Sequence, residues 1–194
     1  MEDLKLEVIA RIHTNSIEMM EARGYDVTPV IGQTHLTEKG IDGIIGSGMD
    51  VSLLSYTVTR DQKRCLLAYA WNLPEARRLA ERDDCAECIV VCNLKQKSYD
   101  SRHSVVNDTA YELYHYEWLL VNPTSYYLVP QHRMLSELEK EQVLKRLSAQ
   151  EHQLPRISPD DPIMRWYGVK PGTLIQIIRK SDVVGDNIYY RLCC

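Results

Sequence analysis

The chain has 194 residues, of which 44% are hydrophobic and 26% are charged, and its formal net charge is −4. This is the composition of an ordinary globular protein that forms one compact domain or two small ones. The apolar runs are too short to cross a bilayer, and the first residues lack the basic-then-apolar pattern of a signal peptide, so we expect an intracellular protein without a membrane span.

Charge is distributed unevenly along the chain. Residues 1–121 carry 13 Lys or Arg against 19 Asp or Glu, whereas residues 122–194 carry 10 against 8. A domain that binds duplex DNA by itself is usually basic on one face. The acidic first part therefore argues against tight DNA binding by this chain alone, and it leaves DNA contact within a larger assembly open.

The first part of the chain is predicted to mix helices and strands. Apolar residues at helical spacing, with a Gly after the last turn, predict a helix over residues 4–23, and Pro74 at a first helical position predicts a second helix over residues 74–82. Apolar runs of strand length predict strands over residues 51–58, 65–71, 89–92 and 110–121. Residues 60–63 are predicted to join the first two strands as a hairpin turn.

Asn122-Pro123-Thr124 is predicted to be a linker between a first domain, residues 1–121, and a second domain, residues 122–194. In the second domain, Ser136 and Glu139 form a capping box that begins a helix to about residue 150. The expected fold class is α/β (α+β), with an α/β first domain and a small mixed α/β second domain.

Local signals predict the rest of the second domain. Asp161 as a cap and Pro162 after it predict a short helix that Gly168 ends. Two strands are predicted after it, over residues 173–179 and 188–192. The expected turns precede each of these strands, at residues 170–172 and 185–187.

Cysteine spacing gives the most tempting metal motif, Cys85-Ala86-Glu87-Cys88, with Cys92 as a third thiol. A structural zinc site usually needs two well-spaced pairs, and the adjacent cysteines at positions 193 and 194 are poor chelators. Cys88 and Cys92 flank a strand-like run, in which cysteine behaves as a small hydrophobic residue. We interpret these cysteines as buried free thiols, with zinc as the alternative, and predict no metal site.

A metal-dependent nuclease is an alternative function, because a helix, a strand hairpin, a helix and a strand are compatible with restriction-endonuclease-like topology. Asp50 could supply the first metal-binding acid. The next strand, residues 65–70, contains neither an acid nor a lysine. A single carboxylate cannot hold the metal ions of such a site, so the sequence argues against nuclease activity.

The second domain carries several motifs in the order and spacing of a known family. They are Leu128-Val129-Pro130-Gln131-His132, Gln153-Leu154-Pro155-Arg156-Ile157, residues 161–168, Lys170-Pro171-Gly172, Ile175-Gln176-Ile177-Ile178-Arg179, Ser181 and Tyr190-Arg191. Together they resemble the fifth subunit of the eukaryotic nuclear RNA polymerases, which polymerases I, II and III share and whose counterpart in archaea is a small polymerase subunit. The likeness covers nearly all of residues 122–194.

The first domain shows a fainter likeness to the same family. Residues 21–28 are similar to the end of the family's first helix, whereas residues 97–103 replace the Thr-Pro-Ser-Ala that is common in the family's polar loop. The archaeal counterpart lacks this domain, so the resemblance implies a eukaryotic or a eukaryote-like viral source.

The resemblance implies a non-catalytic subunit of DNA-directed RNA polymerase. The first domain would be a jaw with a catalytically inactive endonuclease-like fold beside downstream duplex DNA, and the second would anchor the chain to the largest subunit. The chain would hold no cofactor, because the polymerase magnesium belongs to another subunit. The implied location is the nucleus, or a virus if the source is a large DNA virus; the remaining alternative is a free-standing transcription cofactor.

Two sets of candidate site residues follow. Residues expected near DNA, where side chains would contact phosphate, are Lys95, Lys97, Ser98, Arg102 and His103. Residues expected either at the interface with the largest subunit or as signatures of the fold are Pro130, His132, Leu154, Pro155, Arg156, Asp161, Pro162, Arg165, Tyr167, Gly168, Gly172, Arg179, Tyr190 and Arg191. The choice between interface and fold is open for the arginines of this set.

Overall fold

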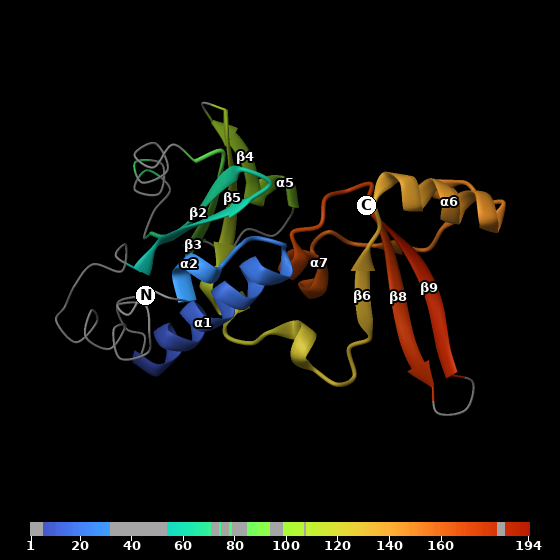
Figure 1. Cartoon of the computed structure of the whole chain (residues 1–194), viewed down its shortest axis with the longest axis horizontal. Helices are drawn as coiled ribbons and strands as arrows, with labels where there is room; N and C mark the ends of the chain where they lie inside the picture. Colours follow the sequence, from blue (N-terminus) through green and yellow to red (C-terminus); the bar gives the residue numbers. More distant parts are fainter. Residues whose placement is uncertain are drawn as a thin grey trace. The chain divides into compact units, whose positions relative to one another are not determined.

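The computed structural model describes residues 6–31, 54–70, 74, 78, 85–93, 99–106, 108–181 and 185–194. The chain consists of two compact units, Met1–Val121 and Asn122–Cys194, called here the N-terminal and the C-terminal unit. Each unit is built on its own β-sheet, and each sheet contains both parallel and antiparallel pairs (Figure 1). The protein is therefore a mixed α/β protein, as predicted.

The N-terminal sheet has five strands in the order β1-β2-β3-β5-β4. Their bounds are β1 Tyr56–Arg60, β2 Lys63–Tyr69, β3 Glu87–Cys92, β4 His103–Val106 and β5 Thr109–His115. Strands β2, β3 and β5 run parallel, and the two edge strands are antiparallel to their neighbours. Because parallel strands are covered on both faces, β2 and β3 are nearly continuous apolar runs, which is the signal that predicted them.

The β1–β2 hairpin closes with a two-residue turn, Asp61-Gln62, in which both residues have positive φ, 50° and 66°. This geometry matches the right-handed twist of the two strands. The predicted turn is confirmed. The predicted first strand is shorter in its described part, since β1 begins at Tyr56, and residues 51–53 lie outside the described residues.

Helix α1, Leu6–Ala22, buries Ile9, Ile12, Met19 and Met20. As predicted, Gly24 terminates the helix: its φ of 82° is favourable only for glycine, and the N–H of Tyr25 donates to the Met20 carbonyl oxygen at 3.0 Å. The shorter helices of the unit are α2 Thr28–Ile31, α5 Tyr99–Arg102 and the 3-10 helix η3 Tyr116–Leu119. No helix in the described part of the chain is long and apolar enough to cross a membrane.

The C-terminal sheet has four strands in the order β6-β8-β9-β7. Their bounds are β6 Gln131–Met134, β7 Arg156–Ile157, β8 Leu174–Ser181 and β9 Gly185–Cys193. Only β7 is parallel to its neighbour, β9. The helices of the unit are α6 Glu137–Leu147, α7 Pro162–Tyr167, and the 3-10 helices η4 Pro123–Ser125 and η5 Glu151–Gln153.

Both predicted helix starts of the C-terminal unit are confirmed. Ser136 and Glu139 form the reciprocal capping box of α6, and Asp161 accepts a hydrogen bond from the N–H of Ile163 at the start of α7. Gly168 ends α7 with φ 62°. Helix α6 stops slightly earlier than predicted, because Ser148 adopts a left-handed conformation with φ 50°.

Two sequence predictions differ from the structure, and a third falls almost entirely outside the described residues. The predicted turn at residues 185–187 is wrong, since these residues pair with residues 179–181 inside the β8–β9 hairpin. Cross-strand pairing overrides the turn preference of Gly-Asp-Asn there. The predicted strand over residues 110–121 ends at His115 and continues as η3. The predicted helix over residues 74–82 lies outside the described residues except for positions 74 and 78, which are helical.

Candidate functional site

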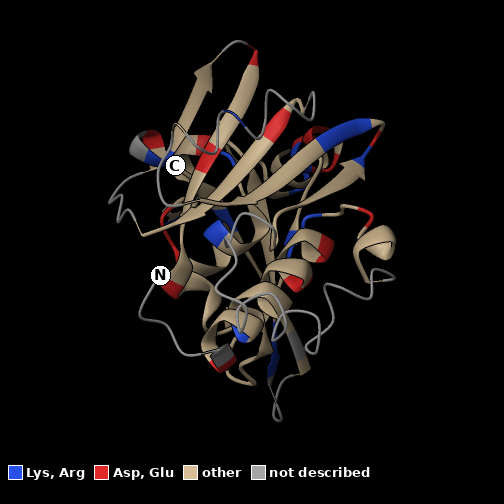
Figure 2. Cartoon of the chain, turned by 90° about the vertical axis from the view of Figure 1, so that its left-hand side faces the viewer, with Lys and Arg blue, Asp and Glu red and all other residues tan. Residues whose placement is uncertain are grey.

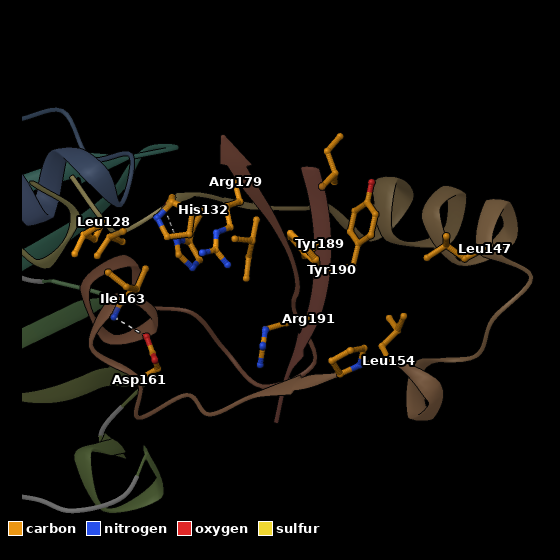
Figure 3. Close-up of a pocket in the computed structure, with 15 residues that line it drawn as sticks. Leu128, His132, Leu147, Leu154, Asp161, Ile163, Arg179, Tyr189, Tyr190 and Arg191 are labelled. Atoms are coloured by element: carbon orange, nitrogen blue, oxygen red, sulfur yellow. Dashed lines mark hydrogen bonds between the residues drawn. The ribbon is translucent and has the colours of Figure 1, made fainter. Parts of the chain in front are cut away.

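The C-terminal unit carries a groove of about 700 Å³. Residues 128–132, the end of α6, the Leu154-Pro155 segment and strands β8 and β9 form its walls (Figure 3). Several apolar side chains of the groove are largely exposed: Leu128 72%, Leu147 45%, Ile188 51% and Tyr189 51%. Exposed apolar side chains that gather in one place are typical of a surface that binds another molecule.

Arginines supply the positive charge in this apolar groove. Arg179 projects from β8 and lies beside His132 in Figure 3, and Arg191 projects from β9. The Nη1 of Arg191 donates to the backbone oxygen of Arg156 at 3.1 Å. The carboxylate of Asp161 lines the same groove but accepts from the Ile163 N–H at 2.9 Å as the cap of α7. The groove therefore offers two exposed guanidinium groups to a ligand.

The structure brings together eight of the fourteen residues that the sequence marked in this unit. The eight that line the groove are Pro130, His132, Leu154, Pro155, Asp161, Arg179, Tyr190 and Arg191. The other six lie elsewhere in the unit: Arg156 in β7, Pro162, Arg165 and Tyr167 in α7, Gly168 at its end, and Gly172 in the turn before β8. Gly172 has φ 93°, and Tyr167 packs against the apolar core, so these two shape the fold.

Sequence reasoning missed Lys140, which is buried in α6. Its Nζ donates to the backbone oxygen of Gly172 at 2.8 Å and pairs with Glu151 at 2.9 Å, and only 9% of its side chain is exposed. These contacts tie α6 and η5 to the turn before β8. The sequence does carry a signal for this position: Lys140 stands three residues before Val143, so the two share a helix face. Because Val143 is buried, Lys140 lies on the inward face of α6 as well.

The N-terminal unit contains a buried charge cluster formed by Arg23, Arg102 and Glu112. Arg23 contacts both carboxylate oxygens of Glu112, at 2.6 and 3.2 Å, and Arg102 lies 3.6 Å from the same carboxylate. The exposed fractions of the three side chains are 5%, 1% and 11%. Burial by itself would raise the pKa of Glu112, but the charge and hydrogen bonds of Arg23, with His103 and Arg102, lower it below its ordinary value.

The positions of the predicted DNA-proximal residues fall into three groups. Lys95, Lys97 and Ser98 lie outside the described residues. His103 is half-buried, stacks on Tyr99 with ring centroids 3.9 Å apart, and contacts the Tyr99 backbone oxygen through Nδ1. Arg102 is turned into the core, where Glu112 holds it, so its position does not favour the predicted phosphate contact.

Positions of Lys and Arg are interspersed with positions of Asp and Glu along the ribbon of the described helices and strands in Figure 2. Residues 1–121 are acidic on balance, which does not favour duplex binding by this unit alone.

The carboxylates of the N-terminal sheet are occupied by structural partners. Glu87 accepts a hydrogen bond from the Tyr25 hydroxyl and pairs with Arg60 at 3.5 Å, and Glu112 is held by Arg23. Asp50, the predicted nuclease acid, lies outside the described residues. Among the residues that the structure describes, no group of three His, Cys, Asp or Glu is placed to hold a metal ion.

The cysteines of the Cys85–Cys92 segment are buried in the core of the N-terminal unit, as predicted. Cys85, Cys88 and Cys92 pack there with Leu66, Val90 and Tyr111. All six cysteines of the chain are free thiols. Burial raises the pKa of Cys65, beside this cluster, to about 12, so its thiol stays protonated at neutral pH.

Comparison with known proteins assigns the C-terminal unit to a family. A family model described as RNA polymerase Rpb5, C-terminal domain, matches residues 121–193, which include the whole groove. DNA-directed RNA polymerase subunit Rpo5 of Archaeoglobus fulgidus is 48% identical over 65 residues, which are 34% of this chain and 86% of that protein. The chain belongs to the RNA polymerase subunit 5 family.

Two longer members of the subunit 5 family match a smaller share of their own length. The chain is 47% identical over 75 residues to "DNA-directed RNA polymerases I, II, and III subunit rpabc1" of Dictyostelium discoideum, covering 39% of this chain and 38% of that protein. It is 40% identical over 80 residues to "DNA-directed RNA polymerases IV and V subunit 5B" of Arabidopsis thaliana, covering 41% and 37%. The matched part thus spans less than two-fifths of these two relatives.

Proposed function

We propose that this chain is a non-catalytic subunit of a DNA-directed RNA polymerase and that its C-terminal unit anchors it to the largest subunit. The observation that carries the proposal is the groove of the C-terminal unit. It lies within the residues that match the subunit 5 family, and exposed apolar walls of this kind are typical of a surface that binds another protein.

The chemistry of the groove suits a protein partner. The core of a protein interface is typically apolar and aromatic, and arginine is the charged residue that is enriched there. Leu128, Ile188 and Tyr189 supply the apolar area, and Arg179 and Arg191 supply guanidinium groups that bind carboxylates in a bidentate manner.

In this proposal the N-terminal unit is a jaw beside downstream DNA with an inactive endonuclease-like fold. The mixed sheet supports this assignment, as do carboxylates that are paired with Arg23 and Arg60. With an acidic balance, the unit would guide DNA through a few phosphate contacts, and the rest of the polymerase would supply most of the affinity.

The proposal also covers chemistry and location. Polymerisation and the catalytic magnesium belong to another subunit, and this chain holds no cofactor. The expected location is the nucleus, or a virus if the source is a large DNA virus. Cleavage of duplex DNA by the purified chain with magnesium or manganese would contradict the non-catalytic role.

Affinity purification of the tagged full chain from its native source, followed by mass spectrometry, tests the proposal. We expect the two largest polymerase subunits at amounts close to that of the chain. A Tyr189→Asp variant, which charges the groove, should reduce their recovery at least about tenfold, because interface aromatic residues often carry most of the binding energy. Leu138→Asp is the matched control, since Leu138 is 66% exposed on α6 and does not line the groove.

Two results would contradict the proposal, the first in its polymerase assignment and the second in its anchor. Recovery of the chain without any polymerase subunit would favour a free-standing transcription cofactor. Equal recovery of the polymerase subunits with Tyr189→Asp and with the control would mean that the chain joins the polymerase without using the groove, and would reject the groove as the anchor.

A further inference from the structure

Strand β9 has an edge that is only partly paired. On one side it pairs with β8 from Gly185 opposite Ser181 to Leu192 opposite Leu174. On the other side β7 pairs with it only at Leu192 and Cys193. Within the described part of the chain, no strand covers this second side from residue 185 to residue 191.

Hydrogen bonds at the end of β9 show which backbone groups face the uncovered side. The N–H of Leu192 donates away from β8, to the Pro155 oxygen at 2.9 Å, whereas the N–H of Cys193 donates to the Thr173 oxygen at 2.9 Å, just before β8. Backbone groups of successive strand residues point to opposite sides. Ile188 and Tyr190 therefore direct their N–H and C=O groups to the uncovered side.

The groove runs along this uncovered edge. Ile188, Tyr189 and Tyr190 of β9 line it, and Leu147 and Leu154 form the wall beyond the edge, on the side of Tyr190 in Figure 3. An uncovered edge with exposed apolar side chains is a liability for a free protein, because it pairs readily with other strands. Such an edge is expected to be covered in the assembled complex.

The arginines of the groove indicate the charge of the occupant. Within the described part of the chain, the side chain of Arg179 makes no hydrogen bond or ion pair, and the side chain of Arg191 donates to a backbone oxygen. Asp161, the acid that lines the groove, already accepts from Ile163. A segment that carries a carboxylate would complement these guanidinium groups.

We infer that an extended segment of the partner polymerase subunit, with apolar side chains and a carboxylate, adds to the C-terminal sheet as a strand along residues 188–190 of β9. The inference rests on the proposed function and names the mode of attachment. Main-chain hydrogen bonds to Ile188 and Tyr190 would supply affinity, and the groove would select the side chains and the acid.

A proline at position 188 tests the main-chain part of this inference. Ile188→Pro removes an N–H that points to the uncovered edge and leaves the hydrogen bonds between β8 and β9 in place. In the full chain co-expressed with the largest polymerase subunit, we expect Ile188→Pro to weaken capture at least about tenfold. Ile188→Ala keeps the N–H and should weaken capture less than about threefold.

A photo-reactive residue gives a second test that does not depend on the folding of the proline variant. Placed at position 188, it should cross-link in the complex to one segment of the polymerase subunit that contains an Asp or Glu. Placed at position 138 on α6, at similar exposure, it should not cross-link to that segment.

Three results would overturn the inference. A folded Ile188→Pro chain that is captured as well as the unchanged chain would exclude strand addition at this edge. Cross-links from position 188 to a second copy of this chain would show that the edge pairs with itself. If the unchanged chain captures no polymerase subunit, the proposed function fails and this inference fails with it, an outcome distinct from failure of the proline variant alone.

Discussion

The two units differ in which side chains they hold in an unusual environment. The N-terminal unit buries charge, with Arg23, Arg102 and Glu112 inside it, whereas the C-terminal unit exposes apolar side chains around its groove. A buried charge cluster restricts how one chain folds, and an exposed apolar groove restricts what the chain binds. The family model matches the unit with the exposed groove, residues 121–193.

The largest effect should come from breaking the buried cluster. Glu112→Gln leaves two buried guanidinium groups without their carboxylate and should lower the free energy of unfolding of the N-terminal unit by about 3–5 kcal/mol. Hydrogen exchange read by mass spectrometry reports the two units separately. Residues 122–194 should keep their protection, so equal loss in both units would contradict the comparison.

Glu137→Gln is the matched control for that substitution. Glu137 lies in the first turn of α6, and its side chain is 81% exposed beside Lys140. Because exposed ion pairs contribute little, we expect a change within about 0.5 kcal/mol in either unit.

Acid should weaken the N-terminal unit through His13. Burial against Tyr56 and Tyr69 lowers the pKa of His13 to about 4, from 6.5. The unfolded chain therefore binds a proton between these values and the folded chain does not, so stability present at pH 7 is lost as pH falls. The loss between pH 7 and pH 5 should be about 2 kcal/mol in urea unfolding.

A His13→Phe variant sharpens the acid experiment, because it removes the titrating group and keeps an aromatic ring in the site. Between pH 7 and pH 5, the free energy of unfolding of this variant should fall by about 2 kcal/mol less than that of the unchanged chain. Glu112, whose pKa is lowered, contributes its loss as pH falls through the ordinary range of a carboxyl pKa and below it, so it contributes little between pH 7 and pH 5. An unchanged slope in the variant would reject His13 as the source.

The smallest effect should come from the cap of α6. Ser136→Ala removes the hydroxyl that accepts from the Glu139 N–H and should cost about 1 kcal/mol in the C-terminal unit alone. Ser136→Asp keeps a capping oxygen and should restore most of the loss in a thermal melt. A loss in the N-terminal unit of similar size would contradict the separation of the two units.

Local chemistry decided which parts of the fold could be predicted. The capping box at Ser136 and the glycines that end α1 and α7 act within a few residues, and each prediction is confirmed. Strands β4, β6 and β7 were missed, because two to four residues give no readable periodicity and their pairing is set by distant segments.

The site could be predicted only in part for the same reason. Motif likeness marked residues of the C-terminal unit, but only folding separates Arg179 and Arg191, which line the groove, from Arg156 and Arg165, which do not. Arg102 was predicted to contact phosphate because it is a cation in a polar segment. In the structure Arg102 is buried against Glu112, which also pairs with Arg23, 89 residues away from Glu112 in sequence. A local sequence pattern cannot reveal a contact over that separation.

The buried thiols determine where an oxidant reaches the chain first. Oxidants attack the thiolate, and burial raises the pKa of Cys65 to about 12 and that of Cys193 to about 11, so both stay protonated. Cys194 is the exposed cysteine of the six. The folded chain should therefore be oxidised first at Cys194, while the buried thiols remain protected as long as each unit stays folded.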